Sequence, residues 1–366
     1  MADWTRRFDS SYRFMRVSRA TGLETGRLPG FQPGGSIERN LDTELKESGS
    51  VGHVGALDVG SDLVRVWMDA RFPVGGGVES VALGTFLPSV SSRSYDGIAS
   101  TSTVKLEGRL KELAQSDFPQ PFMLPAGTDL VAYAAQIAEG SGLAVEADAS
   151  PYRSTAPLYY GLQTGDNEAA ASGSKLAVIN DLLARAGFDS ARTDPMGTVL
   201  MRRTLGIAER KPVWSFAEGR SARFLRPITD ERDTSGVANV VYCVFTGAEE
   251  DGGEQVTTVG YAVDDDPASP WSVQAMGREV VARYDYSEHA TQAEANAKAA
   301  EMLDSTRSVQ RVVTISHVYA PIAPADAVQV AYESGGVRET MGVRTMRLQL
   351  VDGCLTETEV RAYGRA

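Results

Sequence analysis

The sequence has few of the side chains that most often carry out chemistry. Its 366 residues include only two cysteines, three histidines and four tryptophans. Cys243 and Cys354 lie far apart in the chain, which excludes a disulfide framework and a closely spaced cysteine metal motif. Cys243 falls in the apolar run 240–245, so we expect it to be a buried free thiol.

Long hydrophobic runs are absent as well. No stretch approaches the roughly 18 apolar residues that are needed to span a bilayer, and residues 1–7 lead into no apolar signal region. We therefore expect a soluble protein that is made in the cytoplasm, is not exported by the Sec route and does not insert into membranes by itself.

Positive charge is under-represented. The chain has 36 Lys and Arg against 48 Asp and Glu, a net charge of −12. Affinity for duplex DNA comes largely from Lys and Arg side chains that displace counterions, so tight nucleic-acid binding is not expected. Residues 202–232 are rich in arginine, whereas no Lys or Arg occurs between Arg232 and Arg278. Either both segments are solvated surfaces, or neighbouring subunits set one against the other.

No pattern of catalytic or ligand-binding residues stands out. His53, His289 and His317 have no metal-ligand spacing, and HExxH, Gly-x-Ser-x-Gly, P-loop and Gly-x-Gly-x-x-Gly sequences are absent. Two Ser-x-x-Lys matches, at residues 102–105 and 172–175, lack the companion motifs of penicillin-recognising enzymes. A Ser-His-Asp triad or a glycosidase carboxylate pair depends on geometry that a sequence does not give.

Three consecutive aspartates, Asp264, Asp265 and Asp266, are the remaining candidates for cation binding. Carboxylate oxygens suit a hard cation, but the alternating ligands, the glycine and the terminal glutamate of a calcium loop are missing. We expect an exposed loop here. For the whole chain we predict no catalytic, cofactor-binding or metal-binding residues, no cofactor and no enzymatic activity.

A chain of this length exceeds the roughly 250–300 residues at which a single core stops growing, so two or three domains are expected. Residues 8–105 contain short runs of β-branched and aromatic residues, separated by glycines, which predict strands of a barrel or sandwich. The run 63–68 alternates Val64, Val66 and Met68 with other residues, including Arg65, and this predicts a strand with two unlike faces.

The pattern becomes helical near residue 125. Asp129 or Thr128 can cap one helix, and Ser174 can cap a second. A hairpin is predicted over 188–202, with its turn at 194–197, because proline presets φ at the second turn position and glycine supplies a positive φ at the last. Two helices and a hairpin make a compact α/β unit.

Strands dominate again from residue 236, interrupted by a helix at 291–304 that starts with the capping box Thr291-Gln292-Ala293-Glu294. We predict a β-rich α+β fold in which two related β-barrel domains flank a small α/β domain. The predicted domains are 1–125 for the first barrel, which 205–235 could complete, 126–204 for the α/β domain, and 236–366 for the second barrel.

Segments of the chain resemble the baseplate hub or tail-tip hub family of tailed phages, the minor tail proteins of the actinobacteriophage type. The helix–helix–hairpin order of residues 126–204 resembles the small α/β domain of that family. Tyr12–Gly26 resembles the first hairpin of that family, and Gly35–Asn40 with Leu45–Gly49 resembles its next strand region. Gly84–Leu87 with Val104–Leu113 resembles the end of its first barrel, and Asn239–Val241 with 291–304 resembles its second barrel.

The resemblance implies a structural protein of the virion tail tip. Members of the family place two related barrels per subunit in a homotrimer, which forms a pseudo-sixfold ring between the tail tube and the distal tip. The implied partners are further copies of the chain, the distal tail protein, the tape measure protein and other tail-tip or fibre proteins, with genomic DNA as passing cargo only. Because the sequence ends at Ala366 directly after its last strands, no C-terminal peptidase or lysin domain is expected.

Two alternatives from other functional classes stay open at this point. One is a tail-associated cell-wall hydrolase, and the other is a tail adhesin that binds host glycans. The sequence also does not distinguish a siphophage tip from a contractile baseplate or injection particle, nor does it give the stoichiometry or the face that lines the channel.

Overall fold

The computed structural model describes residues 3–74, 77–95, 100–160, 173–219, 222–232, 237–248, 255–269, 271–286, 290–306 and 308–365. The chain divides into two compact units. Unit 1 comprises Met1–Pro227 with Ile315–Val360, and unit 2 comprises Ile228–Thr314 with Arg361–Ala366. No helix among the described residues is long and apolar enough to cross a membrane.

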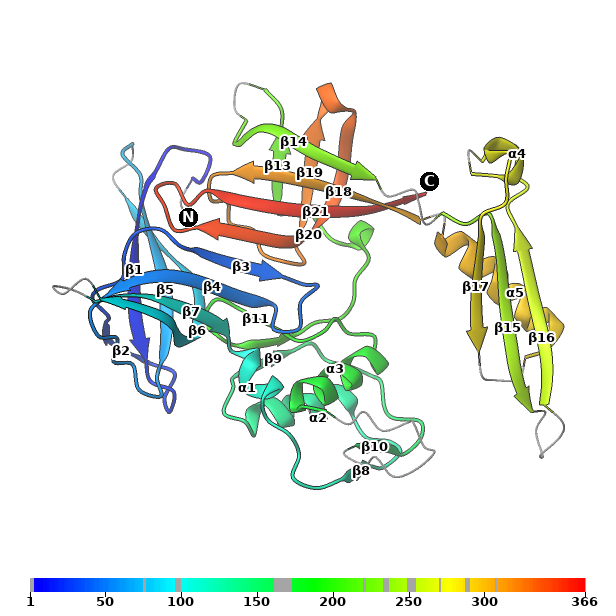
Figure 1. Ribbon diagram of the computed structural model, residues 1–366, viewed down its shortest axis with the longest axis horizontal. Helices are drawn as coiled ribbons and strands as arrows, with labels where there is room; N and C mark the ends of the chain where they lie inside the picture. Colours follow the sequence, from blue (N-terminus) through cyan, green and yellow to red (C-terminus); the bar gives the residue numbers. More distant parts are fainter. Residues whose placement is uncertain are drawn as a thin grey trace. The chain divides into compact units, whose positions relative to one another are not determined.

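The first seven strands are neighbours in one large sheet of unit 1 (Figure 1). They follow the order β2-β1-β5-β6-β7-β4-β3, and every neighbouring pair is antiparallel. Register shifts between Val66 and Trp67 and between Val90 and Ser92 introduce bulges, which bend strands and increase their twist. The strands are β1 (Asp9–Val17), β2 (Glu24–Arg27), β3 (Ser36–Asn40), β4 (Glu47–Val54), β5 (Leu63–Arg71), β6 (Val78–Tyr95) and β7 (Ser100–Gly108).

A strand from near the C-terminus continues this sheet beyond β3. β20 (Val337–Gln349) pairs antiparallel with β3 and also with β19 (Ala327–Tyr332), which pairs in parallel with β13 (Trp214–Ala217). The strand order then runs through β21 (Thr356–Arg365), β18 (Ser308–His317) and β14 (Phe224–Arg232), which have residues in both units.

The β-rich character of the fold is confirmed, but the predicted pair of barrels is not. Among the described strands the order of the large sheet starts at β14 and ends at β2, so no closed barrel is formed. The reason lies in the pairing of β20 with β3, which joins the two ends of the sequence in one continuous sheet. The predicted domain boundaries stay a prediction.

Strand β5 has the two unlike faces that the sequence predicted. Leu63, Val64, Val66 and Met68 are all almost completely buried, and Arg65 is only 5% exposed. The face with Val64, Val66 and Met68 is wholly apolar, whereas the other carries Arg65 and the half-buried Trp67 and Asp69. The turn 194–197 covers the face that carries Arg65, which donates a hydrogen bond to the carbonyl of Met196.

The middle of the chain forms the expected small α/β part, and its predicted helices and caps are confirmed. Asp129 accepts a hydrogen bond from Ala132 N, and Ser174 accepts one from Ala177 N. Buried apolar side chains of the three helices form one core with those of the short strands. The elements are α1 (Leu110–Ala114), β8 (Phe122–Leu124), α2 (Leu130–Glu139), β9 (Val145–Ala147), β10 (Leu158–Tyr160), α3 (Lys175–Arg185), β11 (Arg192–Thr193) and β12 (Val199–Met201), followed by the 3₁₀ turn η1 (Ile207–Glu209).

Unit 2 contains a three-stranded sheet in the order β16-β15-β17 with α5 packed on one face (Figure 1). The predicted capping box is confirmed, since Thr291 N and Glu294 N donate to Glu294 Oε2 and Thr291 Oγ1 respectively. Cys243 is a buried free thiol in the core beneath the helix, as expected. The elements are β15 (Val240–Ala248), β16 (Gln255–Val263), α4 (Val273–Met276), β17 (Val281–Tyr286) and α5 (Gln292–Thr306); in unit 1, the 3₁₀ turn η2 (Glu333–Gly335) follows β19.

Candidate functional site

The turn of the β11–β12 hairpin is held on the large sheet by three buried side chains. Thr85 Oγ1 donates to the carbonyl of Pro195 at 3.0 Å, Arg65 Nη2 donates to that of Met196 at 3.0 Å, and Arg109 Nη1 donates to that of Gly197 at 3.3 Å. Buried backbone carbonyls need such donors, because a buried polar group without a partner costs free energy.

Arg65 is the centre of this contact. Its Nε donates to Thr85 Oγ1 at 2.9 Å, and its Nη1 lies 3.1 Å from Glu24 Oε1, so the buried guanidinium has both hydrogen bonds and a counter-charge. We call Arg65, Thr85 and Arg109 the turn clamp. The clamp fixes the small α/β part of the chain on the large sheet within unit 1.

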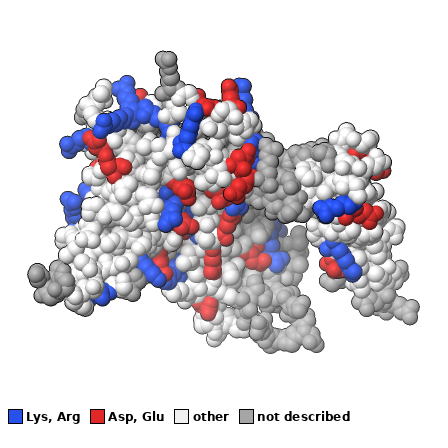
Figure 2. Space-filling model, turned by 45° about the horizontal axis from the view of Figure 1, so that its top comes forward, with Lys and Arg blue, Asp and Glu red and all other residues white. Residues whose placement is uncertain are grey.

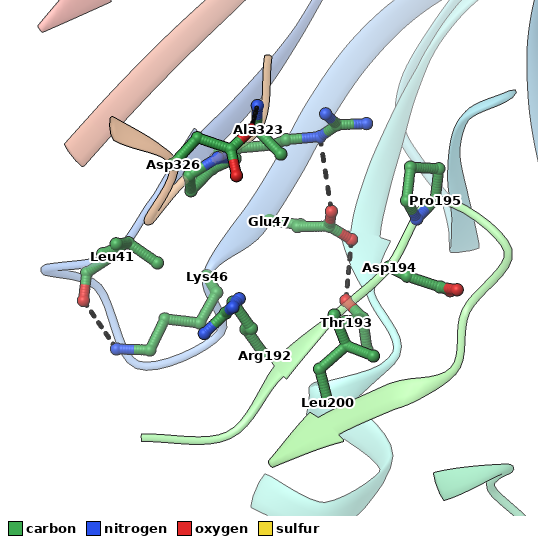
Figure 3. Close-up of a pocket in the computed structure, with 12 residues that line it drawn as sticks. Leu41, Lys46, Glu47, Arg192, Thr193, Asp194, Pro195, Leu200, Ala323 and Asp326 are labelled. Carbon is green, nitrogen blue, oxygen red and sulfur yellow. Dashed lines mark hydrogen bonds and ion pairs between the residues drawn. The ribbon is translucent and has the colours of Figure 1, made fainter. Parts of the chain in front are cut away.

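A pocket of about 240 Å³ lies beside the clamped turn. Three segments from distant parts of the sequence wall it: the β3–β4 connection, the β11–β12 hairpin and the loop 323–326 (Figure 3). We call it the acid–base pocket because charged side chains of both signs line it. It is lined by Arg39, Leu41, Lys46, Glu47, Arg192, Thr193, Asp194, Pro195, Leu200, Ala323, Pro324 and Asp326.

Glu47 forms the inner wall of the acid–base pocket and is 5% exposed. Its Oε1 lies 3.4 Å from Arg39 Nε, and its Oε2 accepts a hydrogen bond of 2.9 Å from Thr193 Oγ1 (Figure 3). Burial raises the pKa of Glu47 to about 7, although Arg39 and Thr193 oppose the shift. Arg39 is itself buried and donates from Nη2 to the carbonyl of Leu83 at 2.7 Å.

The remaining charged groups of the acid–base pocket are less well paired. Arg192 Nη1 lies 3.9 Å from Asp189 Oδ2, and burial lowers the pKa of Arg192. Burial raises the pKa of Asp326, whose Oδ2 accepts one hydrogen bond from Ala323 N at 2.8 Å. Lys46 donates to the carbonyl of Leu41 at 2.7 Å.

The backbone of the acid–base pocket is also unusual. Among the described residues only Lys46, Ala325 and Cys354 combine a side chain with a positive φ, and two of these three lie in its walls or next to them. Lys46 has φ 62° and Ala325 has φ 74°. Such conformations persist only where the surroundings hold them, and they occur often at ligand sites.

The two described histidines are placed as structural residues. His53 Nε2 is 3.1 Å from the carbonyl of Pro29, while His317 binds the Val318 carbonyl through Nδ1 and Thr358 Oγ1 through Nε2. Burial lowers the pKa of His317 to about 4, so it is neutral at pH 7. His289 lies outside the described residues, as does Ser172 of one Ser-x-x-Lys match.

The aspartate run differs in part from the exposed loop that was expected. Asp265 and Asp266 are exposed, but Asp264 is fully buried. Asp264 accepts hydrogen bonds from Asp266 N at 3.2 Å and from Ser269 Oγ at 2.6 Å, which explains its burial as part of a turn. No cluster of potential metal ligands occurs among the residues that the structure describes.

The arginine-rich segment 202–232 does not form a purely basic surface. Arg202 pairs with Glu146 and Asp148, Arg210 lies 3.7 Å from Asp189 Oδ2, and Arg226 pairs with Glu218. Most basic side chains on the face drawn in Figure 2 likewise lie beside acidic ones. The acidic residues at 249–254 are outside the described part of the chain, so whether the two segments face each other between subunits stays a hypothesis.

Neither the turn clamp nor the acid–base pocket was predicted from the sequence. The sequence did predict the turn 194–197, but it did not predict that this turn contacts the large sheet. Arg39 and Glu47 lie directly opposite each other where β3 pairs with β4, but this register was not predicted from the sequence. Arg192 and Thr193 reach them because the turn clamp holds the β11–β12 hairpin on the large sheet.

Comparisons with known proteins identify the fold. No protein-family model and no curated protein matches the sequence. Three solved structures match over nearly the whole length of both chains. They are the tail protein from Neisseria meningitidis MC58 (14% identity, 97% of each chain, TM-score 0.63), the 43 kDa tail protein of prophage MuSo2 from Shewanella oneidensis (13%, 96% and 98%, 0.61) and the prophage tail protein gp18 from Listeria monocytogenes EGD-e (11%, 97% and 95%, 0.52).

Proposed function

We propose that the chain is a structural protein of a phage tail tip, of the baseplate hub or tail-tip hub type. The observation that carries this proposal is the fold that it shares, from end to end, with three tail proteins, two of which are prophage proteins. Fold alone does not determine function, but the match covers 97% of both chains in the first case, so it concerns a whole protein and not one common domain.

In this function the chain acts by assembling. Copies form a ring, a homotrimer, that joins the tail tube to the distal tip. The ring contacts the distal tail protein and other tail-tip or fibre proteins, and tape measure protein and DNA pass through it. Closed rings need subunits that keep their shape, and the turn clamp supports such a role because it holds the small α/β part on the large sheet.

The proposal includes that the chain is not an enzyme. What supports this is the environment of the two described histidines: His53 contacts a backbone carbonyl, and His317 contacts a backbone carbonyl and a threonine hydroxyl. His317 Nε2 is 2.8 Å from Thr358 Oγ1, but both residues are 0% exposed, so this pair of an imidazole and a hydroxyl is out of reach of a substrate in the structure.

Cryo-electron microscopy of intact particles tests the function. We expect density for this chain at the distal end of the tail tube, repeated around the tail axis. Its absence from purified particles, checked by mass spectrometry, would contradict the proposal. Zymography against host peptidoglycan and glycan-array binding address the two alternatives: a clear lytic band would favour the hydrolase, and a glycan signal would favour the adhesin.

A further inference from the structure

We propose that the acid–base pocket binds a carboxylate group carried on a short aliphatic stem, as in a glutamate side chain or a small dicarboxylate. This inference does not depend on the proposed function. It rests on which polar groups of the pocket are already used within the protein and which are not.

The acidic groups of the pocket already have partners. Both oxygens of Glu47 are engaged, one by Arg39 and one by Thr193. Asp194 Oδ1 accepts a hydrogen bond from Thr198 N at 2.8 Å, within its own turn. Asp326 Oδ2 accepts one from Ala323 N.

The basic groups have donors to spare. The Arg192 guanidinium donates no hydrogen bond to any residue that the structure describes, and its nearest carboxylate oxygen, on Asp189, is 3.9 Å away. Lys46 uses one of its three donors, on the Leu41 carbonyl. The buried Nε of Arg39 is not a spare donor, because it faces Glu47 Oε1 at 3.4 Å. The pocket therefore offers unused cationic donors, for which a carboxylate is the best acceptor.

Size and apolar walls define the rest of the ligand. A volume of about 240 Å³ exceeds what a bare carboxylate fills. Leu41, Pro195, Leu200 and Pro324 supply hydrocarbon surface around the charged groups. A few methylene groups between the carboxylate and the pocket mouth would cover this surface, which favours binding by the area they remove from water.

Arg192 is the residue that would bind the guest carboxylate. In Figure 3 it reaches into the pocket from β11, opposite Asp326 on the loop 323–326. An arginine can hold a carboxylate through two parallel hydrogen bonds, whereas lysine cannot. The Arg192 side chain keeps 18% of its surface exposed, so an incoming carboxylate can reach it.

Titration with glutarate, followed by ligand-observed NMR and calorimetry, tests the ligand class. Glutaramide has the same length without charge and should bind at least tenfold more weakly. Arg192→Met should lower the affinity for glutarate at least tenfold, and Arg192→Lys should give an intermediate loss. The matched control is Arg338→Met, because Arg338 also has its nearest carboxylate at 3.9 Å but is exposed outside the pocket; it should leave the affinity unchanged.

Equal binding of glutarate and glutaramide, or wild-type affinity in Arg192→Met, would overturn the proposal. Thermal unfolding accompanies each variant, and we expect Arg192→Met to keep the wild-type melting temperature. If that variant does not fold, Ala323→Leu replaces it, because added side-chain volume in the pocket wall should also exclude glutarate.

Sedimentation velocity with and without glutarate identifies the source of the carboxylate. If a second copy of the chain supplies it, glutarate and Arg192→Met both weaken self-association. If the pocket serves a free dicarboxylate, glutarate binds and the association state does not change. Either result supports a carboxylate site and assigns its natural occupant.

Discussion

At the scale of single residues, the most informative group is Glu47. It is buried next to Arg39, yet burial outweighs the attraction and raises its pKa to about 7. The pair therefore acts less as a stabilising ion pair than as a polar contact that fixes the hairpin, because Thr193 on β11 is the third member. Buried ion pairs commonly contribute little net stability for this reason.

Glu47→Gln should change how stability depends on pH. In the unfolded chain Glu47 ionises near its ordinary pKa of 4.5, but in the folded chain it ionises only near 7. Between these values the folded state holds the extra proton, so this group favours folding below pH 4.5 and that contribution is lost as the pH rises to about 7. The stability of Glu47→Gln relative to wild type should thus rise by about 1–3 kcal/mol between about pH 5 and pH 8.

Urea unfolding at several pH values, followed by circular dichroism, measures this difference. Glu139→Gln, at an exposed position at the end of α2 in the same unit, is the control and should show the same pH dependence as wild type. A constant difference between Glu47→Gln and wild type across this range would mean that Glu47 ionises normally in the folded protein.

At the scale of elements, the β11–β12 hairpin shows how a local pattern can hide a long-range contact. The turn 194–197 was predicted from proline and glycine alone, and the structure confirms it: Gly197 has φ 88°. Gly197 also has a second reason to be glycine. A Cβ at this position would lie 2.8 Å from Arg109 Cδ and 3.2 Å from Thr85 Cβ, both in the turn clamp.

Gly197→Ala should therefore destabilise the protein more than its backbone conformation alone requires. Gly187→Ala is the matched control, because Gly187 has φ 71° but no atom lies within 4 Å of the position that an added Cβ would take. Each change costs roughly 1–2 kcal/mol for the left-handed backbone, and Gly197→Ala should cost about 1–3 kcal/mol more through overpacking. Thermal melts of the two variants measure the difference, and equal losses would show that the clamp tolerates displacement.

A comparable close approach occurs in unit 2. A Cβ on Gly260 of β16 would lie 1.9 Å from the carbonyl oxygen of Ala295 in α5, so the helix can approach the sheet only because this residue is glycine. Gly260→Ala should displace α5 and cost about 3 kcal/mol. Amide hydrogens along α5 should then exchange faster than in the wild type. The control is Gly26→Ala, where no atom lies within 4 Å of the added Cβ, and it should leave exchange along α5 unchanged. Wild-type protection of the α5 amides in Gly260→Ala would contradict the close packing of α5 on β16.

These elements show what the sequence could and could not predict. Helices with caps at Asp129, Ser174 and Thr291 were predictable because capping and periodicity are local. The pairing of β20 with β3 was not predictable, because a single sequence does not indicate that two strands some 300 positions apart will pair. Arg65 and Glu47 are buried where the β11–β12 hairpin contacts the large sheet, through Met196 and Thr193, and this long-range contact could not be predicted from the sequence either.

At the scale of the whole molecule, local ion pairs and the net charge together determine how the chain interacts with DNA. Arg202, Arg210 and Arg226 have acidic partners within unit 1, so the segment with the most arginines is not a purely basic surface. The chain as a whole keeps a net charge of −12. If acidic side chains of such subunits line the channel of the proposed ring, they would repel DNA and keep friction low. A neutral or basic channel surface in the assembled ring would contradict this hypothesis.

The purified chain should consequently not bind duplex DNA at physiological salt. Non-specific binders show dissociation constants of about 1–100 µM through Lys and Arg contacts with phosphates, and we expect binding of this chain to be weaker than that range. Fluorescence anisotropy of a labelled duplex measures it, with a basic protein of similar size as the positive control. Micromolar binding that weakens steeply with added salt would contradict this prediction and reveal an unpaired basic surface.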